Sequence, residues 1–270
     1  MHRNSNSRNE KPVVFVSDTV SDNQLFEHFH RNGYVVLRDV LTLDELGRYV
    51  KLFDGDRAAF GPPNWWHPFQ YQTRNCNALV TSPEFDGLLR HVKILRVIEF
   101  LMNGPVCFSE MCLRHMAPYD GPPRQKFHRD RPHWQEHPLR MDFLQFMLYL
   151  TDVDKDTHCF SMSPESVDDP ILDTQSQLER NGIVDFHGPA GTVVLFNIAA
   201  LHTATVRVTT RERKTVQAYY GHRSRPFLSN CSVIPPRFWR HDADPEVRGF
   251  YGNLNETSKV FLSACEPAPH

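Results

Sequence analysis

The chain has 270 residues, of which 30 are Lys or Arg and 32 are Asp or Glu, so its formal net charge is −2. This length is sufficient for one sizeable domain with a full hydrophobic core and rather short for two. The balanced charge gives no sign of a nucleic-acid partner or of any other polyanion.

The compartment is expected to be the cytoplasm. The polar first residues lack an apolar signal segment, and no stretch has the length of a membrane span, so no membrane partner is expected either. The six cysteines form no CxxC pair, and the chain is too long and too apolar to need a disulfide scaffold. We therefore expect free thiols in a reducing environment.

The N-terminal third has the pattern of helices with one short strand. Residues 1–20 are expected to be a disordered or extended segment, followed by a single domain over residues 21–270. Apolar periodicity and capping signals predict three helices and one strand. The helices are residues 22–31, a helix that starts at the capping box of Thr42 and Glu45 and runs to about residue 53, and residues 84–102; the strand is residues 34–37.

Residues 61–73 (GPPNWWHPFQYQT) contain three prolines and cannot form a long helix. Trp65 and Trp66 are adjacent within this segment. They are interpreted either as a wall of a substrate site or as part of a loop folded over the core.

The rest of the chain has an all-β texture. Short apolar or alternating runs are separated by Gly, Pro and Asp clusters, which is typical of an antiparallel sandwich or jelly roll. The predicted strands are residues 106–116, 142–150, 191–198 and 215–220.

A candidate metal site begins at His128 and Asp130. On an extended segment these two side chains point to the same side and can bind one ion. A third ligand from a distant strand would complete a facial triad, the arrangement of non-haem Fe(II) oxygenases. The triplet alone is weak evidence, because about one His-x-Asp is expected by chance in a chain this rich in His. A solvated pair in a Pro-rich loop is the alternative.

The downstream sequence strengthens the hypothesis. Residues 188–202 read GPAGTVVLFNIAALH, which predicts a buried strand that ends at His202. Arg213 follows eleven residues later, and its planar guanidinium is suited to bind a carboxylate with two hydrogen bonds. His202 and Arg213 at this spacing, after His-x-Asp, are unlikely to occur together by accident.

These segments resemble the phytanoyl-CoA hydroxylase-like (PhyH) family of 2-oxoglutarate oxygenases, which includes ectoine hydroxylases. The likeness covers most of residues 24–225 and rests on FHRNGYVVLRDVLTLDEL, FHRDRPHW, RMDFLQFMLYLTDVD and GPAGTVVLFNIAALH. Trp134 also stands six residues after His128, as in ectoine hydroxylases. The chain departs from the family at residues 163–166 (SPES in place of Pro-Gly-Ser-His) and at Ala204, where a Ser is frequent.

The resemblance implies a mainly β double-stranded β-helix, a cupin-like jelly roll with supporting helices from the N-terminal third. It implies Fe(II) bound by His128, Asp130 and His202, with 2-oxoglutarate and O2 as co-substrates. Arg213 would hold the distal carboxylate of 2-oxoglutarate, and Gln145 would be a secondary contact, unless it is a polar residue satisfied within a core strand. Because Ala204 lacks a hydroxyl, one hydrogen bond to the co-substrate would either be missing or be supplied by Thr203 or Thr205.

The implied activity is hydroxylation, or another oxidation, of an unactivated C–H bond of a small molecule, with release of succinate and CO2. An intact carboxylate at Asp130 argues against halogenation, because halogenating relatives have a small residue there. Three classes of alternative remain open: a cupin-type isomerase or dioxygenase that does not use 2-oxoglutarate, a degenerate binding protein, and an oxygenase with another oxidative outcome.

Candidate substrate contacts lie beside the metal site and in the N-terminal loop. They are Arg131, His133, Trp134, Trp65 and Trp66, and together they would suit a small polar or anionic substrate. Solvated surface charges are the alternative for Arg131. The assembly is expected to be a monomer or a homodimer.

Overall fold

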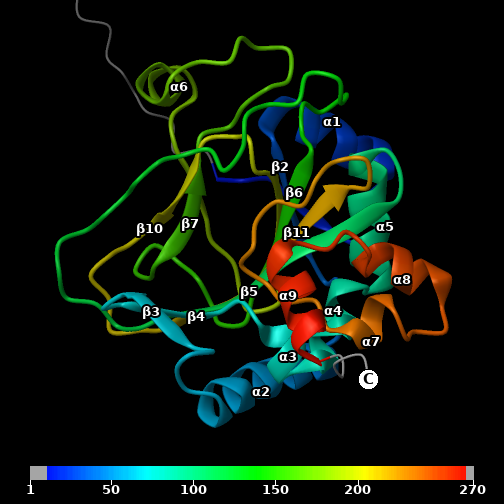
Figure 1. Ribbon diagram of the computed structural model, residues 1–270. Helices are drawn as coiled ribbons and strands as arrows, with labels where there is room; N and C mark the ends of the chain where they lie inside the picture. The colour runs from blue at the N-terminus through cyan, green and yellow to red at the C-terminus, as the bar shows by residue number, and fades with distance from the viewer. Residues whose placement is uncertain (1–10, 266–270) are drawn as a thin grey trace, which may run out of the picture.

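Two sheets form the centre of the computed structural model, which describes residues 11–265 (Figure 1). The larger sheet has the order β1-β2-β9-β6-β11-β5-β4-β3, and the smaller has the order β10-β7-β8. All pairings are antiparallel except β1 with β2. The strands of the large sheet are β1 (Val14–Val16), β2 (Tyr34–Arg38), β3 (Trp66–Phe69), β4 (Gln72–Asn75), β5 (Val106–Met116), β6 (Phe143–Tyr149), β9 (Val193–Asn197) and β11 (Arg213–His222). Those of the small sheet are β7 (Cys159–Met162), β8 (Val184–Phe186) and β10 (His202–Thr205).

Both faces of the large sheet are covered, which explains why β6 and β9 are apolar without alternation. Leu144, Phe146 and Leu148 of β6 belong to the core between this sheet and the helices. Phe143 and Met147 of the same strand belong to a second core between the two sheets. In Figure 1, α1, α5 and α8 lie on one side of the large sheet, and β7 and β10 lie on the other.

The first two helices begin where their sequence signals predict. Helix α1 (Asp22–Asn32) has a capping box at Ser21 and ends at Gly33, whose φ of 75° suits glycine. Helix α2 (Leu43–Ala59) has the predicted capping box, in which the Glu45 carboxylate accepts from the Thr42 backbone N–H at 2.8 Å. It continues six residues beyond the predicted end at Phe53.

The single helix expected over residues 84–102 is wrong, because the structure divides it. After α3 (Ala78–Thr81) and a 3-10 turn (Pro83–Phe85), α4 (Asp86–Leu89) and α5 (Val92–Met102) are separated at His91, whose ψ is 124°. The break changes the helical phase, so that Leu88 and Leu89 are buried together with the apolar stripe of α5.

Helices also form in the second half of the chain, so the expectation of a mainly β fold with helices only from the N-terminal third is too narrow. Helix accounts for 31% and strand for 26% of the structure. The later helices are α6 (Thr174–Asn181), α7 (Pro236–Trp239), α8 (Pro245–Tyr251) and α9 (Glu256–Cys265). Phe250 and Tyr251 of α8 pack on Phe108 of β5, which brings α8 into the core.

The segment expected to be a Pro-rich loop contains the β3–β4 hairpin at the edge of the large sheet. Pro68 is compatible with β3 because an edge strand can lack an outward hydrogen bond. The buried carboxylate of Asp56 anchors this region to α2. It accepts from Trp65 Nε1 at 2.6 Å and from Asn75 Nδ2 at 2.9 Å.

The N-terminal segment expected over residues 1–20 is only partly described, since residues 1–10 lie outside the described part. Within the rest, Val14–Val16 forms β1 and pairs with β2. No helix within residues 11–265 is both long enough and apolar enough to cross a membrane.

Candidate metal and co-substrate site

His128, Asp130 and His202 meet between the two sheets. One potential ligand atom from each lies within 4.8 Å of the other two. His128 Nε2 is 3.3 Å from Asp130 Oδ1, and His202 Nε2 is 3.6 Å from Asp130 Oδ2. Two imidazole nitrogens and one carboxylate on one side of a common point form the donor set of a facial triad.

The main chain fixes how both imidazoles face this point. His128 Nδ1 is 3.0 Å from the Lys126 carbonyl, and His202 Nδ1 is 2.9 Å from the Ala200 carbonyl. A carbonyl can only accept, so each Nδ1 carries a proton and each Nε2, which faces Asp130, is the nitrogen that would present its lone pair to a metal. The residues therefore fit a divalent transition metal.

The ligand-bearing segments differ locally from the sequence prediction. His128 lies in no regular strand but pairs with His202 through an isolated bridge, and the Asp130 N–H donates to the Ile198 carbonyl at 3.0 Å. His202 does not end the buried strand β9. A turn follows β9, and His202 is the first residue of β10 in the other sheet.

Opposing effects act on the pKa of Asp130. Burial alone would raise the pKa, but hydrogen bonds with His128 and His202 outweigh burial and hold it well below its usual value. The hydrogen bond to Asp130 raises the pKa of His128. The Tyr219 hydroxyl also donates to Asp130 Oδ2 at 3.3 Å. The carboxylate is thus ionised and held in one orientation.

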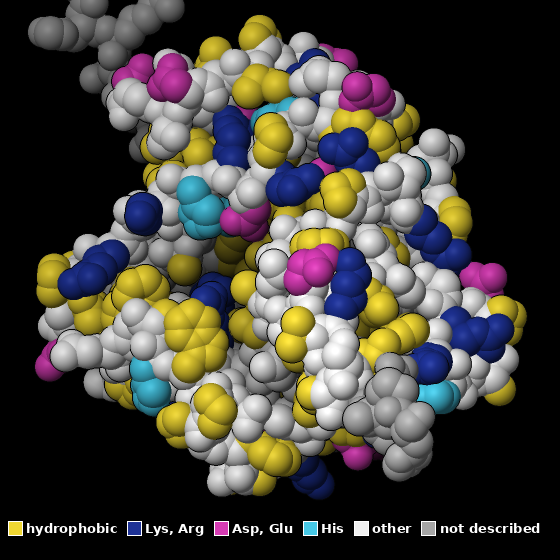
Figure 2. All heavy atoms as spheres, viewed as in Figure 1, with side chains coloured by type: hydrophobic (Ala, Val, Ile, Leu, Met, Phe, Trp, Pro, Cys, Tyr) yellow, Lys and Arg dark blue, Asp and Glu magenta, His cyan; other side chains and the backbone are white. Residues whose placement is uncertain are grey.

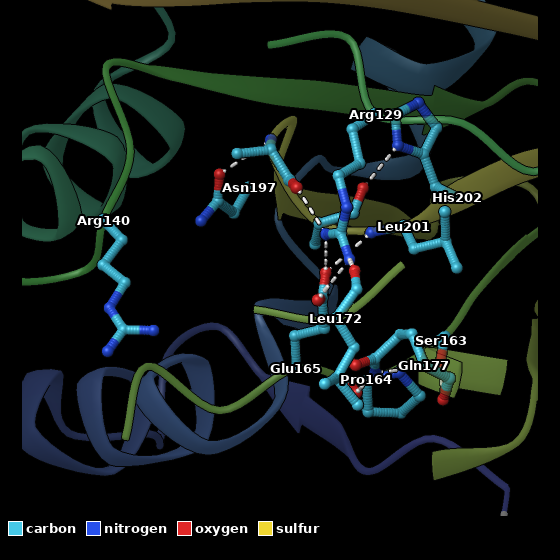
Figure 3. A network of polar contacts seen from close by, with 12 residues as sticks. Arg129, Arg140, Ser163, Pro164, Glu165, Leu172, Gln177, Asn197, Leu201 and His202 are labelled. Atoms are coloured by element: carbon cyan, nitrogen blue, oxygen red, sulfur yellow. Dashed lines mark hydrogen bonds and ion pairs between the residues drawn. The ribbon is translucent and has the colours of Figure 1, made fainter. Parts of the chain in front are cut away.

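An ion pair connects the two ligand-bearing segments (Figure 3). Arg129, between the two first ligands, donates to both Glu165 oxygens, with 2.7 Å from Nη2 to Oε1, and to the Ala199 carbonyl at 2.7 Å. Glu165 Oε2 in turn accepts from the Leu201 backbone N–H at 2.8 Å, beside His202. Glu165 lies within residues 163–166, where the sequence departs from the family that it resembles, so the resemblance did not mark it.

The triad opens into a cavity of about 680 Å³. Its lining includes the three candidate ligands and the expected co-substrate contacts Arg213, Gln145 and Thr203. The lining also contains Gln217 and Tyr219, which alternation along the strand places on one face with Arg213. Further polar residues that the sequence did not single out are Gln72, Arg74, Glu110, Arg114, Arg124 and Lys126. Alternation along β4, β5 and β11 places most of them on the cavity face, a signal that becomes readable once the strands and their register are known.

Arg213 is buried, with 2% of its surface exposed, and no carboxylate within residues 11–265 pairs with it. Its Nη1 and Nη2 lie 3.5 Å and 3.3 Å from the sulfurs of Met116 and Met147, which are weak acceptors. Its Nε has no partner among the described residues, and burial lowers the pKa of the guanidinium. A buried cation facing a cavity without a counter-ion fits a ligand carboxylate, as 2-oxoglutarate would provide.

The other two expected co-substrate contacts already have protein partners. Gln145 Nε2 donates to Gln217 Oε1 at 3.1 Å, and Thr203 Oγ1 accepts from the Lys126 backbone N–H at 2.9 Å. The Thr203 hydroxyl also donates to the Ala204 carbonyl at 3.2 Å. Both residues line the cavity, but binding a ligand would require these contacts to rearrange or to be shared.

None of the five expected substrate contacts lines this cavity. Arg131 pairs with the buried Asp142 at 2.8 Å, and His133 faces a separate small crevice. Trp134 stacks on His137 with ring centroids 5.7 Å apart. Although these residues follow Asp130 closely in sequence, their contacts lie outside the cavity.

The two tryptophans of the N-terminal loop have structural roles. Trp65 is 4% exposed and hydrogen-bonds to Asp56, as expected for a loop folded over the core. Trp66 is 40% exposed, and the guanidinium of Arg74 lies 3.8 Å above its ring. Trp66 therefore contacts a cavity residue without reaching the cavity itself.

Comparison with known proteins gives a consistent family and fold. A family model described as phytanoyl-CoA dioxygenase (PhyH) matches residues 29–215. No curated protein sequence matches this chain at a significant level. EctD from S. alaskensis with bound Fe superposes with a TM-score of 0.64 and 24% identity over 81% of this chain and 83% of EctD. The structure of EctD from S. alaskensis with 2-oxoglutarate and 5-hydroxyectoine superposes with a TM-score of 0.65 and 22% identity. This match covers 85% of this chain and 86% of EctD.

A third structural relative is SnoN, an alpha ketoglutarate dependent epimerase from nogalamycin biosynthesis. Its TM-score is 0.59, with 20% identity over 74% of this chain and 82% of SnoN. At these identities the likeness establishes a shared double-stranded β-helix fold and leaves the reaction open, since the relatives themselves differ in activity.

Proposed function

Because the chain belongs to the phytanoyl-CoA dioxygenase (PhyH) family, a family of iron- and 2-oxoglutarate-dependent oxygenases, we propose that it is itself an Fe(II)- and 2-oxoglutarate-dependent dioxygenase. It would hydroxylate, or otherwise oxidise, an unactivated C–H bond of a small molecule. For hydroxylation the balance is substrate, 2-oxoglutarate and O2 giving hydroxylated substrate, succinate and CO2. One oxygen atom enters the product and the other enters succinate.

One observation carries this proposal. The buried, unpaired guanidinium of Arg213 lines the same cavity as the convergent ligand atoms of His128, Asp130 and His202. A metal site alone would suit many cupin-like enzymes. A metal site together with a carboxylate receptor suits a keto acid that chelates the metal by one end and is held by the other.

Each group of the chain has a defined part in this scheme. His128, Asp130 and His202 would hold Fe(II) and leave coordination positions open, and Arg213 would bind the distal carboxylate of 2-oxoglutarate. Iron with the keto acid supplies the activation of O2. Tyr219 and the backbone carbonyls of Lys126 and Ala200 orient the ligands. Apolar side chains such as Met147 and Phe160 exclude water from part of the cavity wall.

The direct test is an anaerobic titration of the purified protein with Fe(II) and then 2-oxoglutarate. We expect the weak visible charge-transfer band of the iron–keto acid chelate, and succinate after O2 is admitted. Lys155→Gln, at a side chain that is 80% exposed, should behave as wild type. Iron binding without the chelate band, or O2 consumption without succinate from any tested substrate, would favour a metalloenzyme that does not use 2-oxoglutarate.

A further inference from the structure

Two arginines lie side by side on adjacent strands of the cavity wall. Arg74 of β4 and Arg114 of β5 are cross-strand partners, and both line the cavity. Like charges directly opposite each other in an antiparallel pair are destabilising. Such a pair persists in a fold only where something else requires it.

Neither guanidinium forms an ion pair with a carboxylate within residues 11–265. No ion pair of either side chain is found there, the polar side-chain contact of Arg114 is with the Cys112 thiol, and Nε of both arginines is buried without a partner. The described contact of the Arg74 guanidinium is with the face of Trp66, 3.8 Å from the ring centroid. Buried polar groups are nearly always paired, so two adjacent guanidiniums with unpartnered Nε atoms and no paired carboxylate indicate a missing anion.

The remaining charges leave this part of the cavity positive. Arg124 and Lys126 also line the cavity and are exposed. Their side chains form no ion pair or hydrogen bond with another side chain among the described residues. Glu110 is the neighbouring carboxylate on β5, where Ser229 donates to it. Burial raises the pKa of Glu110, which weakens its ability to neutralise the arginines. Figure 2 shows the hollow between the two sheets, with basic side chains visible inside it.

We propose that Arg74 and Arg114 together bind an anionic group of the substrate, a carboxylate or another oxyanion such as phosphate or sulfate. Two guanidinium forks converging from adjacent strands can donate several charge-assisted hydrogen bonds to one oxyanion. This assignment deepens the proposed function and rests on it. In the same scheme Arg213 binds the co-substrate. Its cross-strand neighbour on β5 is Met116, so Arg213 and Arg114 are not directly opposite each other.

Trp66 acts in this scheme as a positioning residue for Arg74. Its ring supports the guanidinium from the side away from Arg114, and the neighbouring Trp65 ties the hairpin to Asp56. Loss of the Trp66 ring would leave Arg74 charged but free to move. Trp66→Leu is therefore expected to weaken anion binding less than Arg74→Gln does.

The experiment measures anion binding to the anaerobic protein loaded with Fe(II) and saturating 2-oxoglutarate, so that Arg213 is already occupied. Isothermal titration uses inorganic phosphate, sulfate and phenylacetate, with the neutral phenylacetamide as the matched control ligand. We expect at least one anion to bind, and phenylacetamide to bind at least ten-fold more weakly than phenylacetate if phenylacetate is that anion. Which anion binds best identifies the kind of oxyanion.

Variants then locate the binding site. Arg74→Gln and Arg114→Gln should each weaken binding of the best anion by roughly ten-fold or more, since each removes charge-assisted hydrogen bonds. Arg74→Lys, which keeps the charge but lacks the fork, should fall between wild type and Arg74→Gln. Arg38→Gln, at an exposed arginine outside the cavity, should leave affinity unchanged. All four variants should fold, because none removes a described ion pair.

Three results would overturn the assignment while the chelate band stays intact. They are no binding by any of the anions, equal binding in wild type and the two glutamine variants, and an Arg114→Gln variant whose affinity loss is for 2-oxoglutarate instead. The last result would place Arg114 in the co-substrate site. Failure of the proposed function is separately visible, because the wild-type chelate band would then be absent, and the substrate assignment would fall with it.

Discussion

Arg129 and Glu165 form an ion pair that ties together the two segments carrying the candidate metal ligands. Arg129 Nη2 donates to Glu165 Oε1 at 2.7 Å, and the Glu165 side chain is 7% exposed. The same carboxylate holds the backbone of Leu201, and the same guanidinium holds the Ala199 carbonyl. This charged pair therefore reinforces the backbone bridge that joins His128 and His202.

Breaking this pair should lower both stability and metal affinity. We expect Arg129→Gln or Glu165→Gln to cost about 3 kcal/mol in the free energy of unfolding, because the remaining partner stays buried without its counter-charge. Metal affinity should fall as His202 loses its fixed position. Denaturant unfolding and equilibrium titration with Fe(II) check both effects.

The control for this prediction is the exposed pair of Lys155 and Asp156. Lys155→Gln should change the free energy of unfolding by less than about 0.5 kcal/mol, since surface ion pairs contribute little. Losses below about 1 kcal/mol in the Arg129 and Glu165 variants, with unchanged metal affinity, would show that the pair does not position the ligands.

Arg213→Met should stabilise the ligand-free protein while removing co-substrate binding. The wild-type guanidinium is buried between two thioethers with an unpaired Nε, so its replacement by an apolar side chain relieves a desolvation cost. We expect a higher Tm and an increase of about 100-fold in the dissociation constant for 2-oxoglutarate, with Fe(II) affinity retained.

Arg207→Met is the matched control. This arginine is also partly buried, but it has acceptors on Asp185 and on the Thr157 carbonyl. Its loss should lower the Tm and leave 2-oxoglutarate binding unchanged. Equal affinity for 2-oxoglutarate in wild type and Arg213→Met would exclude Arg213 as the carboxylate receptor.

Tyr219→Phe should weaken metal binding without disturbing the fold. The variant removes the hydroxyl that donates to Asp130 Oδ2, and loss of such support typically weakens metal affinity by about ten-fold or more. Tyr220→Phe is the control on the opposite face of the same strand, where the hydroxyl donates to the Leu89 carbonyl. It should reduce stability by about 1 kcal/mol with unchanged metal affinity. Unchanged metal affinity in Tyr219→Phe together with weaker metal binding in Tyr220→Phe would show that Tyr219 does not support the metal ligands.

Two buried histidines should make the protein less stable as the pH falls below neutrality. His137 Nδ1 accepts from the Leu139 N–H and His158 Nδ1 accepts from the Arg207 N–H, while each Nε2 faces a backbone carbonyl. Only a neutral imidazole satisfies both contacts. Burial lowers the pKa of both residues in the folded state.

The unfolded chain therefore binds protons more readily, with a pKa of about 6.5 for each histidine. The contribution of the two neutral histidines to the free energy of unfolding is fully present above about pH 6.5. It declines as the pH falls from about 6.5 towards their lower pKa values in the folded state. Thermal unfolding between pH 7.5 and 5 should show this decline, and His137→Gln should make it shallower. His241→Gln, at an exposed position, should follow the wild-type profile. A flat wild-type profile over this range would contradict the prediction.

The sequence by itself determined the elements whose signals are local. Capping boxes at Ser21 and Thr42 and the turn at Gly33 depend on a few adjacent residues, so their helices begin where predicted. Strand β5 was predicted with its observed bounds, because its apolar run is enclosed by Gly, Pro and Asp clusters. The family-like spacing of His128, Asp130, His202 and Arg213 likewise identified four residues that line one cavity.

Only the tertiary structure decided which other residues join them. Arg131 and Trp134 follow the His-x-Asp segment closely in sequence, yet they pack outside the cavity. Arg74 lies far from that segment and enters the cavity wall, because the register of β4 on β5 places it opposite Arg114. Strand pairing over long separations is set by the balance of burial across the whole domain. Sequence proximity therefore fixed the metal-site motif, and three-dimensional pairing fixed the lining of the cavity.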